Sequence, residues 1–408
     1  MVTTRRRQQQ EEGKRKREET LNTICNSIRK RGKTLSSTLT NDIVLEILSK
    51  VRDVEDLIRF KFACKSWYTL LCEPFFINMH LNQSISNNNF AFMVYYYYFN
   101  THIYSIDCDI SSSSFKLNRA VKINTPFKTP FRIYCSCNGI FLVCVSYKLR
   151  RICMWNPSTG EHKDLSDELP KISKLPSPWY SLGYDLSRDD YKVIIKYYNK
   201  DTRSDAYVYS MRTNSCKRLQ DVPYIIYGVV YPPCISFDSG IFLNGAIHWL
   251  GNHIYEFLLR IVSFDLANDE FKDLQLPDVL FDNESKRLGV FEECLCIYHF
   301  NEDIRYIDMF MMKEYGVKES WTKLFSINVD IQLEFVHMLN FKVICITNNG
   351  KLLVQWNHKD LALYDPKHGG QKCGNIKIDG LTKRLSEYRS ISTYVKSLVS
   401  LGANTSLI

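Results

Sequence analysis

The chain has 408 residues, of which 45% are hydrophobic and 24% charged, so it is a globular protein long enough for two domains or one large repeat architecture. Its net charge of +9 is concentrated at one end: residues 1–33 carry 11 basic and 4 acidic side chains (+7), and the other 375 residues carry 42 and 40 (+2). A nucleic-acid-binding role would therefore rest on the N-terminal tail alone, because such binding depends on many phosphate contacts.

The remaining composition indicates an intracellular protein rich in strands. No apolar segment follows the arginine-rich start, so a secretory signal is not expected, and the most apolar run, residues 90–106, is too short and too polar to span a bilayer. The 14 cysteines are scattered along the chain, which favours free buried thiols over a disulfide framework. The aromatic content of 13% favours strands over helices, and no membrane partner is expected.

Residues 1–34 form a basic tail with few apolar side chains, so the segment cannot bury enough surface to offset the entropy of ordering. A solvated, disordered extension is one interpretation. The other is a bipartite nuclear import signal, which would place the protein in the nucleus as well as the cytoplasm. The residues of the two import-like clusters are Arg5, Arg6, Arg7, Lys14, Arg15, Lys16 and Arg17.

Residues 35–81 are predicted to be helical. Apolar side chains recur at helical spacing from Ile43 to Val51, after a capping residue at Thr40 or Asn41. A second apolar set extends from Val54 to Leu71. A segment of this length cannot enclose so many large side chains, so part of its apolar surface requires a partner.

This segment resembles an F-box in its Ile-Leu pairs, its Leu57-Ile-Arg-Phe, its Cys64-Lys-Ser-Trp and its closing Pro74-Phe-Phe. Thr40 stands where the family usually has proline, and Asp53 where it often has a Pro-Val turn, which could weaken adaptor affinity. The resemblance implies docking on a Skp-type adaptor. The side chains that the resemblance implies for adaptor binding, buried partly against the adaptor and partly within the segment's own fold, are Leu39, Ile43, Ile47, Leu48, Leu57, Phe62 and Trp67.

Residues 82–408 contain repeats of about 50 residues, the length of a kelch-type propeller blade. Within each repeat a polar pair precedes an apolar strand, and a later apolar strand ends on a polar turn, as at Trp155-Asn156 and Phe264-Asp265. Six repeats predict six blades, and a seventh could be assembled from the chain ends, with residues 391–401 closing the ring. The polar pairs are Asn88-Asn89, Asn138-Gly139, Asp189-Asp190, Asn244-Gly245, Glu292-Glu293 and Asn349-Gly350.

Several strings in this part are similar to the F-box-associated domain of plant F-box proteins, among them Ser136-Cys-Asn-Gly, Phe242-Leu-Asn-Gly-Ala-Ile-His-Trp and Ile261-Val-Ser-Phe-Asp. S-locus F-box proteins and defence-type F-box/kelch proteins resemble them equally, so the subgroup stays open. The expected fold class is α+β multidomain: a short helical F-box followed by an all-β kelch-like propeller.

Catalytic motifs are absent: the sequence has no phosphate loop, GxSxG elbow, HExxH helix or dinucleotide GxGxxG. Cys135-x-Cys137 and Cys294-x-Cys296 lack the CxxC spacing of zinc knuckles, so neither a metal nor a cofactor is predicted. His248 is interpreted as a structural histidine of a blade. Trp155, Trp249, Trp321 and Trp356 recur at related repeat positions, which favours packing between blades.

The two resemblances together imply a non-catalytic adapter of an SCF-type ubiquitin ligase, with a Skp-type adaptor, a cullin and a protein substrate as partners. Two alternatives stay open: an interaction scaffold that acts without ubiquitination, and a nuclear protein that associates with nucleic acid through its tail. Substrate recognition is expected on the connecting loops 163–180, 199–205, 223–238 and 278–286. The aromatic anchors predicted there are Trp179, Tyr224, Tyr227 and Tyr231.

Overall fold

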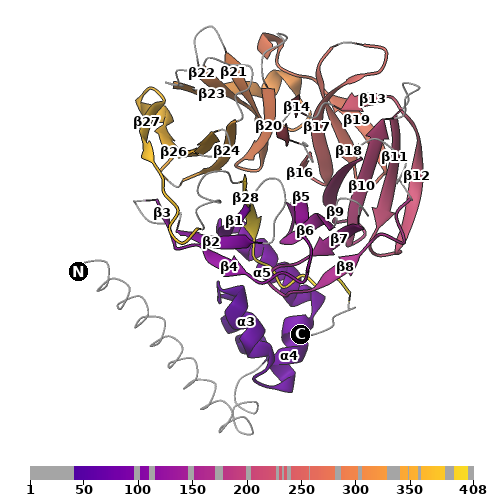
Figure 1. The fold of residues 1–408 in the computed structure, drawn as a ribbon, viewed down its shortest axis with the longest axis vertical. Coiled ribbons are helices and arrows are strands. Elements are labelled where there is room, and N and C mark those ends of the chain that lie inside the picture. Colours follow the sequence, from indigo (N-terminus) through magenta and orange to yellow (C-terminus); the bar gives the residue numbers. More distant parts are fainter. Residues whose placement is uncertain are drawn as a thin grey trace. The chain divides into compact units, whose positions relative to one another are not determined.

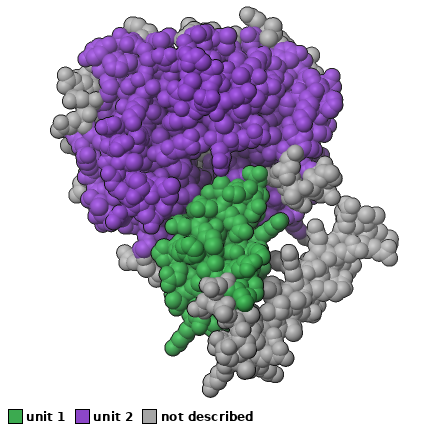
Figure 2. Space-filling view, turned by 180° about the vertical axis from the view of Figure 1, so that it is seen from behind, with its two compact units in different colours: residues 1–89, 396–399 green, residues 90–395, 400–408 purple. Residues whose placement is uncertain are grey.

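The computed structural model describes residues 41–402 apart from 96–101, 110–114, 146–150, 171–177, 199–203, 227–228, 232–233, 237–239, 257, 281–285, 302–305, 329–340, 348, 357–359 and 382–389. The import-like clusters and Leu39 lie outside the described residues. The chain divides into a helical unit, residues 1–89 with 396–399, and a strand unit, residues 90–395 with 400–408 (Figure 2). The expected boundary at 81/82 falls inside a helix whose Leu81 and Ser84 are buried.

The helical unit has four described helices, as predicted for residues 35–81, and the last one extends beyond that range. Asp53, which stands where the resemblance leads us to expect a Pro-Val turn, caps the second helix, α3. Its Oδ1 accepts a hydrogen bond from the Glu55 amide at 2.9 Å. Pro74 occupies the first turn of the fourth helix, α5, where a backbone N–H would have no partner within the helix, so its absence does not destabilise the helix. None of the described helices has the length and hydropathy to cross a membrane. The helices are α2 (Asn41–Ser49), α3 (Val54–Lys61), α4 (Lys65–Cys72) and α5 (Pro74–Ser86).

The core of the helical unit is completed by the C-terminal segment of the chain. Leu48, Leu57, Leu71 and Phe76 are buried together, and Leu398 packs into the same cluster. Residues 396–399 therefore belong to this unit although they follow the last strand of the chain.

The strand unit is a six-bladed propeller in which antiparallel sheets are arranged as a ring, each with one strand at the centre (Figure 1). The first blade contains β28 (Ser390–Val395), β1 (Phe90–Tyr95), β2 (Ile103–Asp109), β3 (Lys116–Leu117) and β4 (Val121–Ile123). The second contains β5 (Phe131–Cys137), β6 (Ile140–Val145), β7 (Arg151–Trp155) and β8 (His162–Asp164). The third contains β9 (Trp179–Asp185), β10 (Asp190–Tyr198), β11 (Ser204–Ser210) and β12 (Ser215–Val222).

The inner strand of the fourth blade is interrupted. β13 (Tyr224–Ile226) and β16 (Ile241–Leu243) pair one after the other with the same strand, β17 (Ala246–His253), followed by β18 (Arg260–Asp265) and β19 (Glu270–Leu274). Between them β14 (Val229–Tyr231) and β15 (Cys234–Ser236) pair with each other. The fifth blade contains β20 (Lys286–Phe291), β21 (Cys294–Asn301), β22 (Tyr306–Met312) and β23 (Trp321–Asn328). The sixth contains β24 (Phe341–Ile346), β25 (Leu352–Trp356), β26 (Asp360–Asp365) and β27 (Gln371–Asn375). In the described part of the connections lie three 3-10 helices: η2 (Asp278–Leu280), η3 (Lys318–Ser320) and η5 (Pro366–His368).

The predicted blade count of six is confirmed, and the last strand of the chain does not build a seventh blade. β28 pairs with β1 over six residue pairs, from Phe90↔Val395 to Tyr95↔Ser390, and supplies the inner strand of the first blade. Tyr394 packs edge-on against Phe141 of the next blade, with ring centroids 5.2 Å apart. The ring is thus closed by strands from opposite ends of the chain.

Five of the six recurring polar pairs are the turns between the first and second strands of a blade, and Asn88-Asn89 instead leads from α5 into β1. Asn138-Gly139 and Asn244-Gly245 have positive φ at both residues, which is the conformation of the two-residue hairpin turn that suits twisted strands. Glu292-Glu293 adopts the same left-handed conformation without a glycine. The sequence period therefore marks hairpin turns.

The second repeated feature, a polar residue that ends the third strand, also has a structural cause. The side chains of Asn156, Asp265 and Asp365 accept hydrogen bonds from backbone amides two residues later, at 2.9, 3.0 and 3.1 Å respectively. Such bonds mimic a backbone turn and bring the chain back into the fourth strand.

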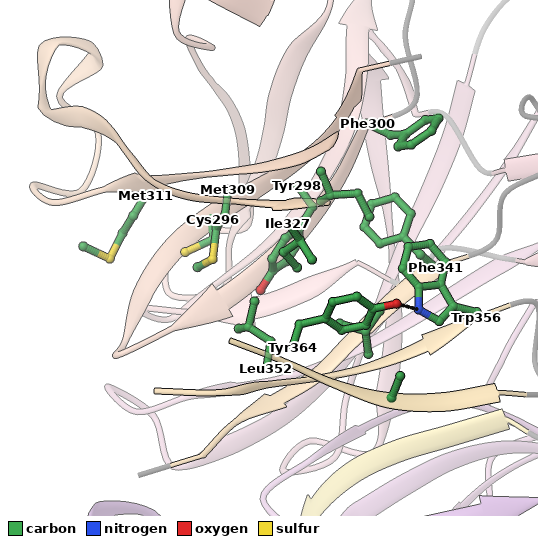
Figure 3. Packing of buried hydrophobic residues seen from close by; sticks show 13 residues of the cluster. Cys296, Tyr298, Phe300, Met309, Met311, Ile327, Phe341, Leu352, Trp356 and Tyr364 are labelled. Atoms are coloured by element: carbon green, nitrogen blue, oxygen red, sulfur yellow. Dashed lines mark hydrogen bonds between the residues drawn. The ribbon is translucent and has the colours of Figure 1, made fainter. Parts of the chain in front are cut away.

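Apolar clusters join neighbouring blades. The cluster in Figure 3 unites Tyr298, Phe300 and Met309 of the fifth blade with Phe341 and Trp356 of the sixth. There the indole N–H of Trp356 donates to the Tyr364 hydroxyl at 3.0 Å. The other three recurring tryptophans also belong to clusters of this kind, as predicted: Trp155, Trp249 and Trp321.

A buried ion-pair network joins the third and fourth blades. The Lys192 ammonium lies 2.8 Å from Asp269 Oδ1 and 3.3 Å from Asp185 Oδ2, and it also donates to the Leu266 carbonyl. Burial opposes ionisation of Asp185, but hydrogen bonds from Ser187, Arg188 and Lys192 outweigh it and hold the pKa of that carboxyl below its usual value.

Candidate functional site

The helical unit exposes large apolar side chains although its core is complete. Ile43 and Ile47, one turn apart on α2, are 44% and 53% exposed, and Phe62 after α3 is 75% exposed. Tyr68 and Phe75 are also exposed. Single exposed apolar residues are common, but five on so small a helical unit indicate a surface made for an apolar partner.

The structure divides the predicted adaptor-binding residues into two groups. Ile43, Ile47 and Phe62 are exposed and free to contact another protein, whereas Leu48 and Leu57 are fully buried in the unit's own core. Trp67 is half-buried, with its ring 5.5 Å from that of Phe60 in an edge-on contact. Leu39 lies outside the described residues. The resemblance that implied all seven could not separate these groups, because adjacent positions on a helix differ by only about 100°.

The segment between α2 and α3 is held by polar contacts from α5 and the residues after it. His80 Nε2 lies 3.0 Å from the Val51 carbonyl, and Asn89 Nδ2 donates to the Arg52 carbonyl at 3.1 Å. Burial lowers the pKa of His80, because a charged ring would be poorly solvated in this partly enclosed position. The ring is therefore neutral near pH 7. These contacts fix the direction in which α2 presents Ile43 and Ile47.

The two ends of the propeller differ in their connections. At one end lie the short turns between the first and second, and the third and fourth, strands of the second to sixth blades. At the other end, here called the long-connector face, the chain leaves the last strand of one blade for the next blade, as after Asp164, Leu274 and Asn328. Phe90 pairs with Val395, so the chain enters and leaves the propeller at the short-turn end.

Of the four loops predicted for substrate recognition, the described parts of 163–180 and 278–286 lie on connections of the long-connector face. Residues 199–203 lie outside the described residues, and part of 223–238 forms the inner strand β13. Two of the predicted anchors pack in the core. Tyr224 is buried, and Trp179 is half-buried against the same inter-blade cluster. Tyr227 lies outside the described residues, as does the side chain of Tyr231. Among the described residues on connections of this face, the large apolar side chains that are exposed are Tyr255, Leu258 and Val279, with Tyr255 83% exposed. Sequence reasoning passed over these three, since nothing in their spacing signals exposure.

A channel of about 540 Å³ runs along the centre of the propeller. β5 and β28 line it along most of their length, and the first residues of β20 and β24 contribute one end. Among the described lining residues, Arg132, Arg287 and Lys342 are cationic and none is acidic.

The described titratable side chains of the propeller do not form a metal-binding cluster. Among the described residues, no group of three or more His, Cys, Asp or Glu side chains could hold a metal ion. Burial raises the pKa of the Cys135 and Cys296 thiols to about 12, which keeps both protonated. His248 is buried and bonded to the Ile241 carbonyl at 3.1 Å and the Tyr315 hydroxyl at 2.6 Å. Burial lowers its pKa to about 4, in keeping with a structural histidine that joins the fourth and fifth blades.

Comparison with known proteins agrees with this architecture. A family model described as "F-box associated beta propeller domain" matches residues 92–401. F-box protein CPR1 of Arabidopsis thaliana is 28% identical over 390 residues, which cover 89% of this chain and 89% of that protein. An F-box/kelch-repeat protein of the same plant is 26% identical, covering 88% of this chain and 94% of the relative. The chain therefore belongs to the family of plant F-box proteins that carry an F-box associated beta-propeller domain.

Proposed function

We propose that the protein is the substrate-recognition adapter of an SCF-type ubiquitin ligase. The helical unit would bind a Skp-type adaptor through Ile43, Ile47 and Phe62, and the propeller would hold a protein substrate for ubiquitination and degradation. The observation that carries this proposal is the exposure of these apolar side chains on a unit whose core is already complete. The family supports it, since its members compared above are F-box proteins.

In such an assembly the chain needs no catalytic residue of its own. Its contribution is proximity: a bound substrate lysine meets a ubiquitin-charged enzyme as if within one molecule, at a high effective concentration. The long-connector face suits the substrate, because the chain enters and leaves the propeller at the short-turn end. Exposed Tyr255, Leu258 and Val279 offer apolar contacts on that face.

The test is co-purification with a Skp-type adaptor and cullin. Ile47→Asp combined with Phe62→Glu places two charges in the proposed apolar contact, so we expect a loss of about 3 kcal/mol or more, which is over 100-fold in affinity. Both side chains are exposed, so the thermal unfolding midpoint should stay unchanged. Leu186→Asp, an exposed apolar residue on a propeller turn, is the matched control and should bind normally. Undiminished binding by the double variant would refute the proposal.

We also propose that the protein resides in both nucleus and cytoplasm. The clusters at residues 5–7 and 14–17 support this, because closely spaced Lys and Arg residues are typical of import signals. Deletion of residues 1–33 should reduce nuclear enrichment of a fluorescent fusion without reducing adaptor binding. An unchanged distribution would leave the segment as a solvated extension only.

A further inference from the structure

The outer side of α4 carries exposed apolar residues that the proposed adaptor contact does not use. Tyr68 is 55% exposed, and Phe75, at the start of α5, is 67% exposed. Cys64 and Cys72 are also exposed, and they stand four residues before and after Tyr68, so the three share one side of the helix. The four residues, here called the α4 surface, are Cys64, Tyr68, Cys72 and Phe75. Rows of side chains at this spacing are the ones that pack against a second helix.

One segment of the N-terminal tail has the sequence pattern of an amphipathic helix. Its apolar residues recur at i, i+3, i+4 and i+7, and the four positions between them are polar. Thr20 is a capping residue before them, residues 29–31 are basic, as suits a last turn, and Gly32 suits the end of a helix. A helix over residues 21–31, here called the tail segment, is too short to be stable in water without a partner. Its apolar residues are Leu21, Ile24, Cys25 and Ile28.

We propose that the tail segment packs on the α4 surface of its own chain, as a further helix of the helical unit. The described chain begins at Asn41, so nine residues, 32–40, join the tail segment to α2. Nine residues can span about 30 Å, whereas α4, with 8 residues, is about 12 Å long, so the tail segment can reach this surface. A tethered segment is also present at a high effective concentration, which favours it over a separate partner. The inference is independent of the proposed adapter function.

The charges at the ends of the two elements favour a parallel alignment. Lys65 is the first residue of α4, Glu73 follows its last residue, and both are exposed. The tail segment follows Glu18 and Glu19 and ends with the three basic residues 29–31. In a parallel pair, opposite charges would meet at both ends, whereas in an antiparallel pair like charges would meet. The surface therefore complements the tail segment in charge as well as in apolar character.

Native cysteines allow a test by crosslinking in the full-length protein. A short bis-maleimide should join Cys25 of the tail segment to Cys64 or Cys72 of the α4 surface, and peptide mass spectrometry identifies the linked pair. Cys373, which is exposed on the outer strand β27, measures the background of random encounters. We expect links from Cys25 to the α4 surface to exceed links from Cys25 to Cys373 about tenfold or more.

Two tail variants separate docking from the nearness that the tether alone provides. Ile24→Asp with Ile28→Asp places two charges among the apolar residues, so the crosslinks to the α4 surface should fall about tenfold. Thr23→Asp with Asn26→Asp is the matched control, because it adds the same charge on the polar side of the predicted helix. The control should crosslink like the wild type.

Amide hydrogen exchange gives a second measurement, in which the surface is changed and the tail is not. Residues 21–31 should exchange about tenfold more slowly in the wild type than in Ile24→Asp, Ile28→Asp, as expected for a helix that is docked about nine tenths of the time. Tyr68→Glu with Phe75→Glu should lose the same protection. Both side chains are exposed, so the protection of α3 and α5 should persist in this variant.

Several results would overturn the inference. These are equal crosslinking by the two tail variants, and exchange at residues 21–31 that is as fast in the wild type as in Ile24→Asp, Ile28→Asp. Crosslinked dimers in place of internal links would assign the α4 surface to a second copy of the chain and contradict docking within one chain. Protection that arises only after addition of phosphatidylserine vesicles would assign the tail segment to a membrane surface instead.

Discussion

A chain that ends at Leu381 is expected to lose the cooperative unfolding transition of the propeller. The truncation removes β28, which pairs with β1 over six residue pairs and is the inner strand of the first blade. It leaves β1 as an open edge and uncovers Phe141 and the cluster shared by the first two blades. Near-ultraviolet circular dichroism should show the loss of fixed aromatic packing, and urea unfolding should no longer be a single sharp transition.

Two further variants separate ring closure from chain length. A chain that ends at Gly402 keeps β28 and every described contact of the C-terminal segment, so it should unfold like the full chain. Tyr394→Ala keeps the strand but removes the aromatic contact with Phe141 and the 2.8 Å hydrogen bond to Ser105. It should cost about 3–5 kcal/mol of unfolding free energy. A cooperative transition in the chain ending at Leu381 would show that closure by β28 is dispensable.

Lys192→Ala is the substitution expected to weaken the contact between the third and fourth blades most. The lysine side chain is 5% exposed and that of Asp185 1% exposed, so the substitution leaves a buried carboxylate without one of its cationic partners. It also removes the donor to the Leu266 carbonyl. Breaking a buried pair in this way costs about 3–5 kcal/mol, which equilibrium urea unfolding would measure.

Lys217 offers a matched control for Lys192, because both lysines approach Asp269. Lys217 is 70% exposed and lies 3.8 Å from Asp269 Oδ2, so Lys217→Ala should change stability by about 0–1 kcal/mol. If the two variants were equally stable, the network would contribute no more than a surface ion pair. A large loss at Lys192 alone would show that burial, and not the number of charges, decides its contribution.

The local features of the fold could be predicted from the sequence, because they arise within a few residues. Asn138-Gly139 marks a hairpin turn by its left-handed preference, and Asp265 marks the end of a strand by capping the next turn. Repetition of such signals was enough for the blade count. The pairing of β28 with β1 joins residues about 300 positions apart and leaves no periodic signal, so the ring closure could not be predicted with the same certainty.

The residues of the candidate site could be predicted less completely, because the exposed fraction of a side chain depends on how the complete core packs. On α2, Ile47 and Leu48 are neighbours of similar chemistry, yet Ile47 is 53% exposed and Leu48 is buried. On the propeller, Tyr224 looked like a loop aromatic but pairs with His253 in an inner strand. The lining of the central channel joins residues of separate blades, and only the closed ring brings them together.

The C-terminal segment imposes an order on the maturation of this protein. The ribosome makes the F-box helices first, but their core includes Leu398, and the first blade waits for β28. Neither unit can reach its final packing until almost the entire chain has been synthesised. A prematurely terminated polypeptide would therefore lack both a closed propeller and a complete helical unit, which would make it a poor competitor of the full-length chain for any partner that binds these units.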